Sequence, residues 1–447
     1  MNFPLPEVAA ALGLAAASLP PAQVTGWSVD SRNISRGDLF FALGGPNHDG
    51  HEFVRDALAK GAVAAVVERP VAAEGVMLET ANTLEALESL ARWARGRWAG
   101  RMVAVTGSAG KTTTKEIIAR LLGSAMTVGK SAGNLNNHIG LPLSVLRLPP
   151  EARAAVLEIG MNHPGEIRRL AGIAAPAIGV ITNVGHAHVE QFASIEDVAL
   201  AKRELIEALS SGGVAVLNAD DPRVERFREV HAGRSVTFGL SPGADVRAED
   251  IEQRVEGIRF RLGAVRFESP LAGIHNVLNL LAGLAVAGLF GIEPGDLREA
   301  VAALEAGERR GRRLIHRGVT VLDDCYNANP EAVQRMLDLL SAEPAGRRLA
   351  VLGEMLELGR MTSSLHRDVG RYAAEHGIDV LVGIRGAARE MIEGAVEAGM
   401  SRDAAFFFEE PGEAGDFLGG QTRPGDVVLF KGSRGTRVEL ALERYMR

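Results

Sequence analysis

The residues best suited to chemistry lie together in one short segment, residues 106–113, which reads T-G-S-A-G-K-T-T. An apolar run precedes this segment and a helical pattern follows it. A glycine-rich turn between a strand and a helix aims backbone N–H groups at one point, which suits a polyphosphate. Lys111 would supply positive charge for the outer phosphates, and Thr112 a hydroxyl for Mg²⁺. Val105 stands where the standard pattern has its first glycine, so the segment is a shortened form of the phosphate-binding loop. The apolar run before it and the helical pattern after it are those the motif requires, and they favour this interpretation over a chance strand–helix turn.

Polar residues also follow the next two apolar runs, residues 154–159 and 177–182. Glu158 closes the first run, and His186 and His188 follow the second. In open parallel sheets, ligands bind beyond the carboxyl ends of the strands, and Mg²⁺-assisted phosphoryl transfer needs charged or imidazole groups there. Because a buried carboxylate is costly, we interpret Glu158 as a metal ligand rather than an exposed strand end. The two histidines fit a site and a solvent-facing loop equally well.

Other candidates carry less information on their own. Asn276 and Asn279 share one face of an apolar helix and could read the edge of a base, although Asn276 could simply cap that helix. Lys202 alone reads as a solvated helix residue. Residues 323–330 are typical of a binding turn. Residues 431–435 hold a lysine and an arginine that suit a carboxylate or phosphate, or a plain basic surface turn.

Composition describes a soluble α/β enzyme of several domains. The chain has 447 residues, 46% hydrophobic and 23% charged, with a formal net charge of −7, which excludes the basic footprint of a nucleic-acid binder. The chain has one cysteine, Cys325, which rules out an internal disulfide and fits a reducing compartment. No histidine stands near Cys325 in the sequence to activate its thiol, so we do not expect Cys325 to act as a nucleophile. No apolar run is long enough to span a membrane. Residues 8–19 are apolar but follow Glu7 rather than Lys or Arg, so we expect a packed helix and a cytoplasmic protein.

Alternation of strand and helix patterns predicts three units: residues 1–81, 82–308 and 309–447. The first contains expected strands at 27–32, 38–43 and 62–67, a helix at 52–60, and a glycine-rich loop at 44–51 that is either a binding loop or a plain turn. The central unit should form a parallel sheet covered on both faces, with an antiparallel ribbon at 255–267 and an apolar helix at 276–290. The basic run at 309–313 begins the third unit, a smaller α/β layer with expected strands at 319–323, 348–352, 380–384 and 426–431 and helices at 331–340 and 363–376.

Several segments, in order along nearly the whole chain, resemble the Mur ligase family of bacterial cell-wall synthesis. They are residues 30–32 (DSR), 37–40 (GDLF), 49–53 (DGHEF), 106–113, 133–137 (GNLNN), 158–166 (EIGMNHPGE), 326–330 (YNANP) and 352–359 (LGEMLELG). The runs at 162–167, 326–330 and 352–359 are most similar to the family member that adds a dipeptide, and the D-N-P-R run of the sister enzyme that adds the third amino acid is not found.

The resemblance implies an α/β protein of three domains: one for the UDP end of the substrate, a central P-loop parallel-sheet ATPase domain, and a smaller Rossmann-like C-terminal domain that closes over the site. ATP would phosphorylate the terminal carboxylate of UDP-N-acetylmuramoyl-tripeptide, and the amine of D-alanyl-D-alanine would attack the acyl phosphate. The third residue of the tripeptide, diaminopimelate or lysine, stays open. A monomer without membrane insertion is expected.

The resemblance also implies roles for particular residues. It makes Lys111, Glu158, His188 and Lys202 catalytic, and matches Lys202 to a carbamylated lysine. Two Mg²⁺ ions would be bound by Thr112, Glu158, His188 and Lys202. The nucleotide would contact Gly107, Ser108, Ala109, Gly110, Lys111, Thr112, Thr113, Asn276, Asn279, Arg312 and Asp324. The other substrates would contact Ser31, Arg32, Gly45, Asn47, Asp49, His51, Asn134, Asn137, Asn162, Tyr326, Asn327, Asn329, Lys431, Ser433 and Arg434. His138 departs from the family pattern, which has an acidic residue there, and Cys325 replaces a usual serine.

Two other hypotheses stay open. A related ligase that extends folate with glutamate would share the central domain but lack a unit like residues 1–81. A nucleotide-binding switch without ligase activity would not need Glu158, His188 and Lys202 beside Lys111. ATP turnover that depends on both a UDP-sugar peptide and a dipeptide would separate the three.

Overall fold

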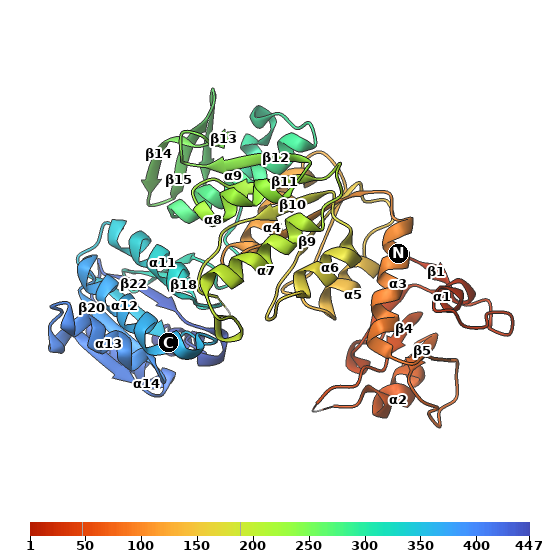
Figure 1. The fold of residues 1–447 in the computed structure, drawn as a ribbon. Coiled ribbons are helices and arrows are strands. Elements are labelled where there is room, and N and C mark those ends of the chain that lie inside the picture. Colours follow the sequence, from red (N-terminus) through yellow and green to blue (C-terminus); the bar gives the residue numbers. More distant parts are fainter. Residues whose placement is uncertain (47, 188) are drawn as a thin grey trace.

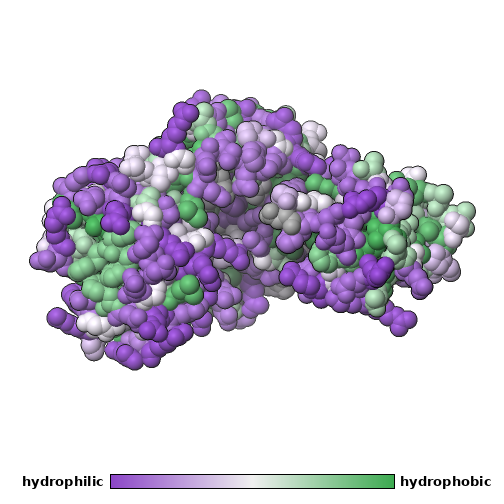
Figure 2. All heavy atoms as spheres, turned by 90° about the horizontal axis from the view of Figure 1, so that it is seen from below, coloured by the Kyte–Doolittle hydropathy of each residue, from purple (hydrophilic) through white to green (hydrophobic). Residues whose placement is uncertain are grey.

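The structure is a computed structural model that describes residues 1–46, 48–187 and 189–447. Three α/β domains lie in a row, with the N-terminal domain at one end, the central domain in the middle and the C-terminal domain at the other end (Figure 1). Seen from below, the surface is hollowed where the domains meet, and hydrophilic residues gather there (Figure 2). No helix in the described ranges is long and apolar enough to cross a membrane.

The N-terminal domain is built on a four-stranded parallel sheet in the order β3-β4-β5-β6. The first expected strand is shorter than predicted, because the Asp30 side chain accepts a hydrogen bond from the Arg32 amide and starts a 3₁₀ turn. The expected helix at 8–19 is instead α1, Leu5–Ala11: Pro4 and Pro6 favour its start, and Gly13, at φ +74°, lies just beyond its end. The remaining elements are β1 (Phe3–Pro4), β2 (Gln23–Val24), β3 (Gly26–Ser28), β4 (Asp38–Phe41), α2 (Val54–Ala59), β5 (Ala64–Val67) and β6 (Met77–Glu79).

The central domain contains a seven-stranded sheet in the order β13-β12-β11-β10-β7-β9-β8, in which every neighbouring pair is parallel. Its inner strands are almost wholly buried, as expected for a parallel sheet covered on both faces. The strands are β7 (Arg101–Thr106), β8 (Val128–Lys130), β9 (Ala154–Glu158), β10 (Ile178–Ile181), β11 (Val214–Asn218), β12 (Arg234–Gly239) and β13 (Val246–Arg247). The prediction of this sheet is confirmed.

Helices pack on both faces of the central sheet. α4 and α9 bury Ile117, Leu121 and Leu280 against one face, while α3, α5, α6 and α7 cover the other. The antiparallel ribbon is a separate three-stranded sheet that starts earlier than expected, at β14. The elements are α3 (Thr83–Arg97), α4 (Lys111–Gly123), α5 (Gly140–Leu146), α6 (Glu166–Ala174), α7 (Ile195–Glu207), α8 (Pro222–Glu225), β14 (Glu249–Arg254), β15 (Gly257–Leu262), β16 (Val265–Ser269), α9 (Ile274–Leu289) and α10 (Arg298–Ala302).

The C-terminal domain has a six-stranded sheet in the order β17-β18-β22-β19-β20-β21. Only β17 runs antiparallel, against β18. The basic junction expected at 309–313 therefore leads directly into an edge strand, which the sequence did not predict. The elements are β17 (Arg312–His316), β18 (Val319–Asp324), α11 (Pro330–Ala342), β19 (Arg348–Gly353), α12 (Thr362–Glu375), β20 (Val380–Ile384), α13 (Ala388–Glu397), β21 (Ala405–Phe408), α14 (Pro411–Gln421), β22 (Val427–Lys431) and α15 (Glu439–Tyr445).

Candidate active site

Two glycines shape the loop between β7 and α4. Gly107 has φ +154° and Gly110 has φ +80°, values that residues with a Cβ rarely adopt. A Cβ on Gly107 would lie 1.8 Å from Thr182 Oγ1, and a Cβ on Gly110 would lie 2.6 Å from Asn279 Oδ1. The loop thus passes so close to its neighbours that only glycine fits, and α4 begins immediately after it with free N–H groups.

The loop following β10 supports the phosphate loop. The Asn183 side chain accepts a hydrogen bond from the Ala109 amide at 2.9 Å, and the hydroxyl of Thr182 donates to the Ala109 carbonyl at 2.7 Å. Ser108 Oγ donates to the Gly185 carbonyl at 2.9 Å and accepts from the Gly185 amide at 2.8 Å. The loop is therefore pre-organised by its neighbours rather than by a bound phosphate.

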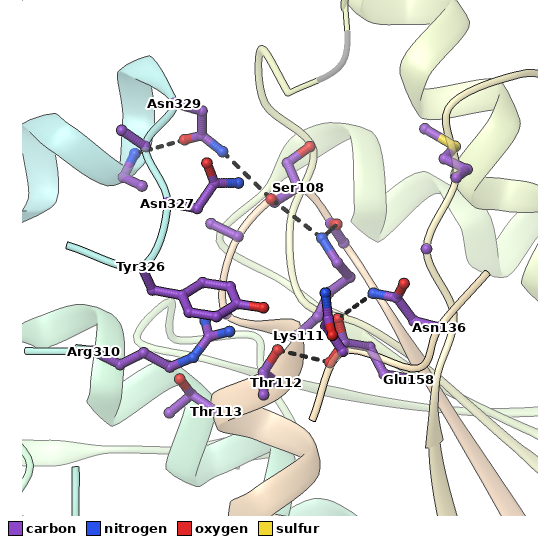
Figure 3. Close-up of a pocket in the computed structure, with 18 of the residues that line it drawn as sticks. Ser108, Lys111, Thr112, Thr113, Asn136, Glu158, Arg310, Tyr326, Asn327 and Asn329 are labelled. Atoms are coloured by element: carbon purple, nitrogen blue, oxygen red, sulfur yellow. Dashed lines mark hydrogen bonds between the residues drawn. The ribbon is translucent and has the colours of Figure 1, made fainter. Parts of the chain in front are cut away.

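Lys111 folds back over the loop, where its Nζ donates to the Gly107 carbonyl at 2.8 Å (Figure 3). Burial lowers the pKa of Lys111; the negative charge of Glu158 acts in the opposite direction, and the positive charge of Arg310 lowers the pKa further. A lysine in a cavity with a second cation nearby is well placed to bind an anion.

Glu158 ends β9 with its carboxylate directed at the first turn of α4 (Figure 3). Its side chain is buried and accepts hydrogen bonds from Thr112 Oγ1 at 2.7 Å and from Asn136 Nδ2 at 2.8 Å. Thr112 and Glu158 thus form a pair of hard oxygen donors beside the phosphate loop. Outside positions 47 and 188, no group of three His, Cys, Asp or Glu side chains could hold a metal. A Mg²⁺ ion at this pair would complete its shell with phosphate oxygens and water, as Mg²⁺ commonly does. The predicted ligand His188 lies outside the described residues.

Lys202 lies on α7, is 2% exposed and lines the same cavity. Burial, followed by the nearby charge of Lys111, holds the pKa of Lys202 well below its ordinary value. No residue that the structure describes accepts a hydrogen bond from this amine. The sequence alone predicted a solvated lysine; only the resemblance placed it in the site.

The C-terminal domain reaches the phosphate loop through the start of α11. Asn329 Nδ2 donates to the Ser108 carbonyl at 3.4 Å, while its Oδ1 caps α11 through the Ala332 amide. Glu331 accepts from the His186 amide at 2.9 Å and lies 2.6 Å from His186 Nδ1. The contact with Glu331 raises the pKa of His186. Burial raises the pKa of Glu331, but the bonds from His186 outweigh burial and leave that pKa below its ordinary value.

A second group of C-terminal residues forms the opposite wall. The guanidinium of Arg310 lies 3.6 Å from the centroid of the Tyr326 ring (Figure 3). The guanidinium of Arg434 lies 5.7 Å from the same centroid. Lys431 pairs with Asp324 and donates to the Asn327 carbonyl at 2.9 Å. This wall brings several cations to the phosphate loop.

The structure does not bring Arg312 to the cavity. Arg312 is exposed on the edge strand β17, and it is Arg310 that lines the cavity. The reason is the backbone: Arg309 at φ +56° and Gly311 at φ +73° turn the chain on either side of Arg310, and of the arginines at 309–313 it is Arg310 whose guanidinium lies over Tyr326.

A cavity of about 580 Å³ joins these residues between the central and C-terminal domains. The predicted residues that line it are Gly107, Ser108, Ala109, Gly110, Lys111, Thr112, Thr113, Asn134, Asn137, Glu158, Asn162, Lys202, Asn276, Asn279, Asp324, Tyr326, Asn327, Asn329, Lys431 and Arg434. Ser433 lies behind the wall, where it donates to the Ala328 carbonyl at 3.3 Å and accepts from the Leu356 amide at 3.0 Å.

The remaining predicted substrate residues belong to the N-terminal domain and do not line this cavity. They are Ser31, Arg32, Gly45, Asp49 and His51; Asn47 lies outside the described residues. His51 is buried, with Nδ1 2.6 Å from Asp49 and Nε2 accepting from the Glu68 amide at 2.9 Å. His51 therefore fixes the predicted binding loop to its own domain.

Several cavity residues were not predicted as site residues. They are Asn136, His138, Gly160, Met161, His163, Glu166, Arg169, Leu170, His275, Arg310, Ala328, Ala332, Arg335 and Met336. Burial, with a smaller effect from the charges of Arg335 and Lys431, lowers the pKa of His275 to about 3, so its ring is neutral. Asn136 and Glu166 lie within the segments 133–137 and 158–166, on which the family resemblance was based. Their place in these segments was the only indication in the sequence that they could belong to the site.

Comparisons with known proteins agree along the whole chain. Residues 23–95 match the model of the Mur ligase family catalytic domain, residues 105–287 that of the Mur ligase middle domain, and residues 308–434 that of the Mur ligase, glutamate ligase domain. The UDP-N-acetylmuramoyl-tripeptide–D-alanyl-D-alanine ligase of Bacillus subtilis is 34% identical over 93% of this chain and 92% of its own length. A crystal structure of MurF from Acinetobacter baumannii superimposes with a TM-score of 0.92 at 31% identity, over 100% of this chain and 99% of that chain. MurF from Thermotoga maritima, solved in complex with ADP, has a TM-score of 0.85 at 30% identity, over 95% and 97% of the two chains.

Proposed function

This chain belongs to the Mur ligase family, and we propose that it joins D-alanyl-D-alanine to UDP-N-acetylmuramoyl-tripeptide and converts ATP to ADP and phosphate. The observation that carries the proposal is the convergence of the phosphate loop, Glu158 and the wall around Tyr326 on one cavity between two domains. Relatives of that name at 34–37% identity over most of the chain support the choice of substrates.

ATP would bind with its phosphates on the loop from Gly107 to Thr113 and at the start of α4. Backbone N–H groups and Lys111 would neutralise the phosphates, and Arg310, which lines the cavity, would make the contact that the resemblance implied for Arg312. Asn276 and Asn279 lie at the start of α9 beside the loop and would contact the base, and Asp324 the ribose.

A Mg²⁺ ion fits between Thr112 and Glu158, whose oxygens already lie 2.7 Å apart. Bound there, it would neutralise the charge that develops on the transferred phosphoryl group. Lys202 also fits a carbamate: it is buried, it lines the cavity, and a lowered pKa increases the fraction of neutral amine, the form that reacts with CO₂. The resulting anion would lie near Lys111 and face a cavity otherwise rich in cations. His188 and a second Mg²⁺ stay a prediction.

The reaction proceeds in two steps. The terminal carboxylate of the tripeptide attacks the γ-phosphorus of ATP, the bond to ADP breaks, and an acyl phosphate forms. The amine of D-alanyl-D-alanine then attacks the acyl carbon, loses a proton, and phosphate leaves with its bonding electron pair. Positioning of the two substrates supplies most of the acceleration, and the contact of α11 with the phosphate loop keeps water from the acyl phosphate.

The UDP end of the long substrate would extend away from the cavity to the N-terminal domain, where Ser31, Arg32 and the loop from Gly45 to His51 are its proposed contacts. Those residues lie apart from the cavity, as a substrate that spans two domains requires. We propose a cytoplasmic monomer acting in peptidoglycan precursor synthesis, without nucleic acid or membrane insertion.

Phosphate release from ATP tests the proposal, measured with UDP-N-acetylmuramoyl-tripeptide in the presence and absence of D-alanyl-D-alanine. We expect release only with both substrates, and a UDP-linked pentapeptide by mass. Lys111→Ala should abolish release while leaving the fold intact, whereas Lys130→Ala, an exposed lysine of the same domain paired with Glu116, should not. Release without any UDP-sugar peptide would favour a nucleotide switch, and release with folate and glutamate would favour the folate-type ligase.

A further inference from the structure

The first turn of α6 presents two opposite charges to the rim of the cavity, Glu166 and Arg169. They stand three positions apart, so they share one face of the helix. Both line the cavity, and the reaction proposed above does not use either of them.

Glu166 is held as an anion. Its Oε2 accepts hydrogen bonds from the Asn162 amide at 2.7 Å and the His163 amide at 3.3 Å, and its Oε1 lies 3.3 Å from His163 Nδ1. Burial raises the pKa of Glu166, but these donors outweigh burial and leave the pKa below its ordinary value. Oε1 keeps room for a further donor, because a carboxylate oxygen accepts two hydrogen bonds.

Arg169 is oriented by a buried carboxylate on another helix. Its Nε donates to Glu88 Oε2 at 3.0 Å, and Glu88 is 2% exposed on α3. The two terminal nitrogens of Arg169 have no hydrogen-bond partner among the residues the structure describes. Arg168, one position earlier, points elsewhere and bonds Glu207 of α7 at 2.8 Å.

We propose that Glu166 and Arg169 bind the far end of the third residue of the tripeptide, and that this residue is 2,6-diaminopimelate. The inference rests on the proposed function. Once the reacting carboxylate lies at the phosphate loop, the side chain of that residue must run along the same cavity. Diaminopimelate ends in a carbon that bears an ammonium and a carboxylate, which complement Glu166 and Arg169 respectively. Lysine ends in the ammonium alone and would leave Arg169 without an anion.

Steady-state kinetics with two UDP-N-acetylmuramoyl-tripeptides, one containing diaminopimelate and the other lysine, test this assignment. We expect the wild type to have a KM for the diaminopimelate peptide about tenfold lower, the size of one charge-assisted hydrogen bond at a half-exposed rim. Arg169→Gln should raise that KM to the lysine value and leave kcat and the lysine KM unchanged. Glu166→Gln should raise both KM values, since both peptides carry the ammonium.

Arg168→Gln is the matched control, because it removes the neighbouring charge from the same helix outside the cavity, and it should change neither KM. Arg169→Lys keeps a positive charge next to Glu88 and should retain part of the preference for the diaminopimelate peptide. This variant distinguishes the loss of the arginine contact from a loss of the fold. Equal KM values for the two peptides in the wild type would overturn the inference, as would a preference that survives in folded Arg169→Gln. Turnover with neither peptide would instead overturn the proposed function, and the inference with it.

Discussion

Replacing Lys202 by methionine should stabilise the protein and abolish its activity at the same time. Lys202 is 2% exposed, and burial together with the charge of Lys111 holds the pKa of its amine well below the ordinary value. None of the described residues accepts a hydrogen bond from it. Moving an amine that is charged and hydrated in the unfolded chain into this buried position costs roughly 1–3 kcal/mol, and methionine has a similar length without the polar end.

The free energy of unfolding should therefore rise by about 1–3 kcal/mol in Lys202→Met. For a domain of this size each kcal/mol raises Tm by about 2–4 °C. Lys115 is the matched control: it is equally buried in the same domain, but its Nζ donates to the carbonyls of Ser131 at 2.8 Å and Gly133 at 3.0 Å. Lys115→Met leaves those carbonyls unpaired, so its Tm should fall. We therefore expect Tm to rise in Lys202→Met and to fall in Lys115→Met, although both replace a buried lysine by methionine.

Thermal unfolding in carbonate-free buffer measures the stability, because the amine is then unmodified. In phosphate-release assays Lys202→Met should lose about 10²–10³-fold in kcat, the usual effect of removing one charge-stabilising group from a site. Lys202→Ala leaves a cavity, and added acetate or formate should restore part of its activity if the native group is a carbamate. A Lys202→Met protein that melts below the wild type would refute the reasoning about its environment, and full activity in Lys202→Ala would refute its role.

Three further predictions concern the C-terminal domain and the junction before it. Arg310→Gln should raise the KM for ATP about tenfold, the loss of one charge-assisted contact, while Arg312→Gln should leave it unchanged. Glu331→Gln removes the charged partner of His186, so kcat should fall about tenfold with little change in the KM for ATP. Burial lowers the pKa of His366 from 6.5, so its neutral form stabilises the domain fully above about pH 6.5 and progressively less as pH falls toward the lowered pKa. Between pH 7 and pH 5, the Tm of the wild type should therefore drop more steeply than that of His366→Gln.

The central sheet and the phosphate loop could be predicted because their signals are local. An apolar strand followed by Gly-Lys-Thr and a helical pattern leaves few alternatives, and Glu158 at a strand end is hard to explain without a site. The predicted bounds of the N-terminal helix were wrong, because its end depends on a turn at Gly13 that interrupts an otherwise apolar run.

The sequence could not predict which side chains enter the cavity at positions where contacts between distant parts of the chain determine the orientation. Residues 309–313 contain four arginines, and only the left-handed turns at Arg309 and Gly311 determine that Arg310 faces the cavity. Lys202 was predicted to be solvated because a single lysine on a helix usually faces solvent. The helix α7 packs against β7, β10 and α6, which are distant in the sequence, and this packing buries Lys202.

Few residues make the contacts between the C-terminal domain and the phosphate loop with its supporting loop: Asn329 and Glu331 on one side, and Ser108, Gly185 and His186 on the other. Ser108 shares its hydroxyl with Gly185 and its carbonyl with Asn329, while Glu331 approaches Gly185 so closely that a Cβ there would lie 2.7 Å from its carboxyl carbon. Each such hydrogen bond contributes only about 0.5–1.5 kcal/mol, or somewhat more where a charge takes part. The Glu190 amide also donates to the Glu357 carbonyl at 3.0 Å, so the two domains touch at a second place. Polar contacts of this size at the phosphate loop can be shifted by the differential binding energy of one substrate. Closure over the acyl phosphate can therefore depend on which substrates are bound, because the same residues that hold the C-terminal domain also shape the phosphate loop.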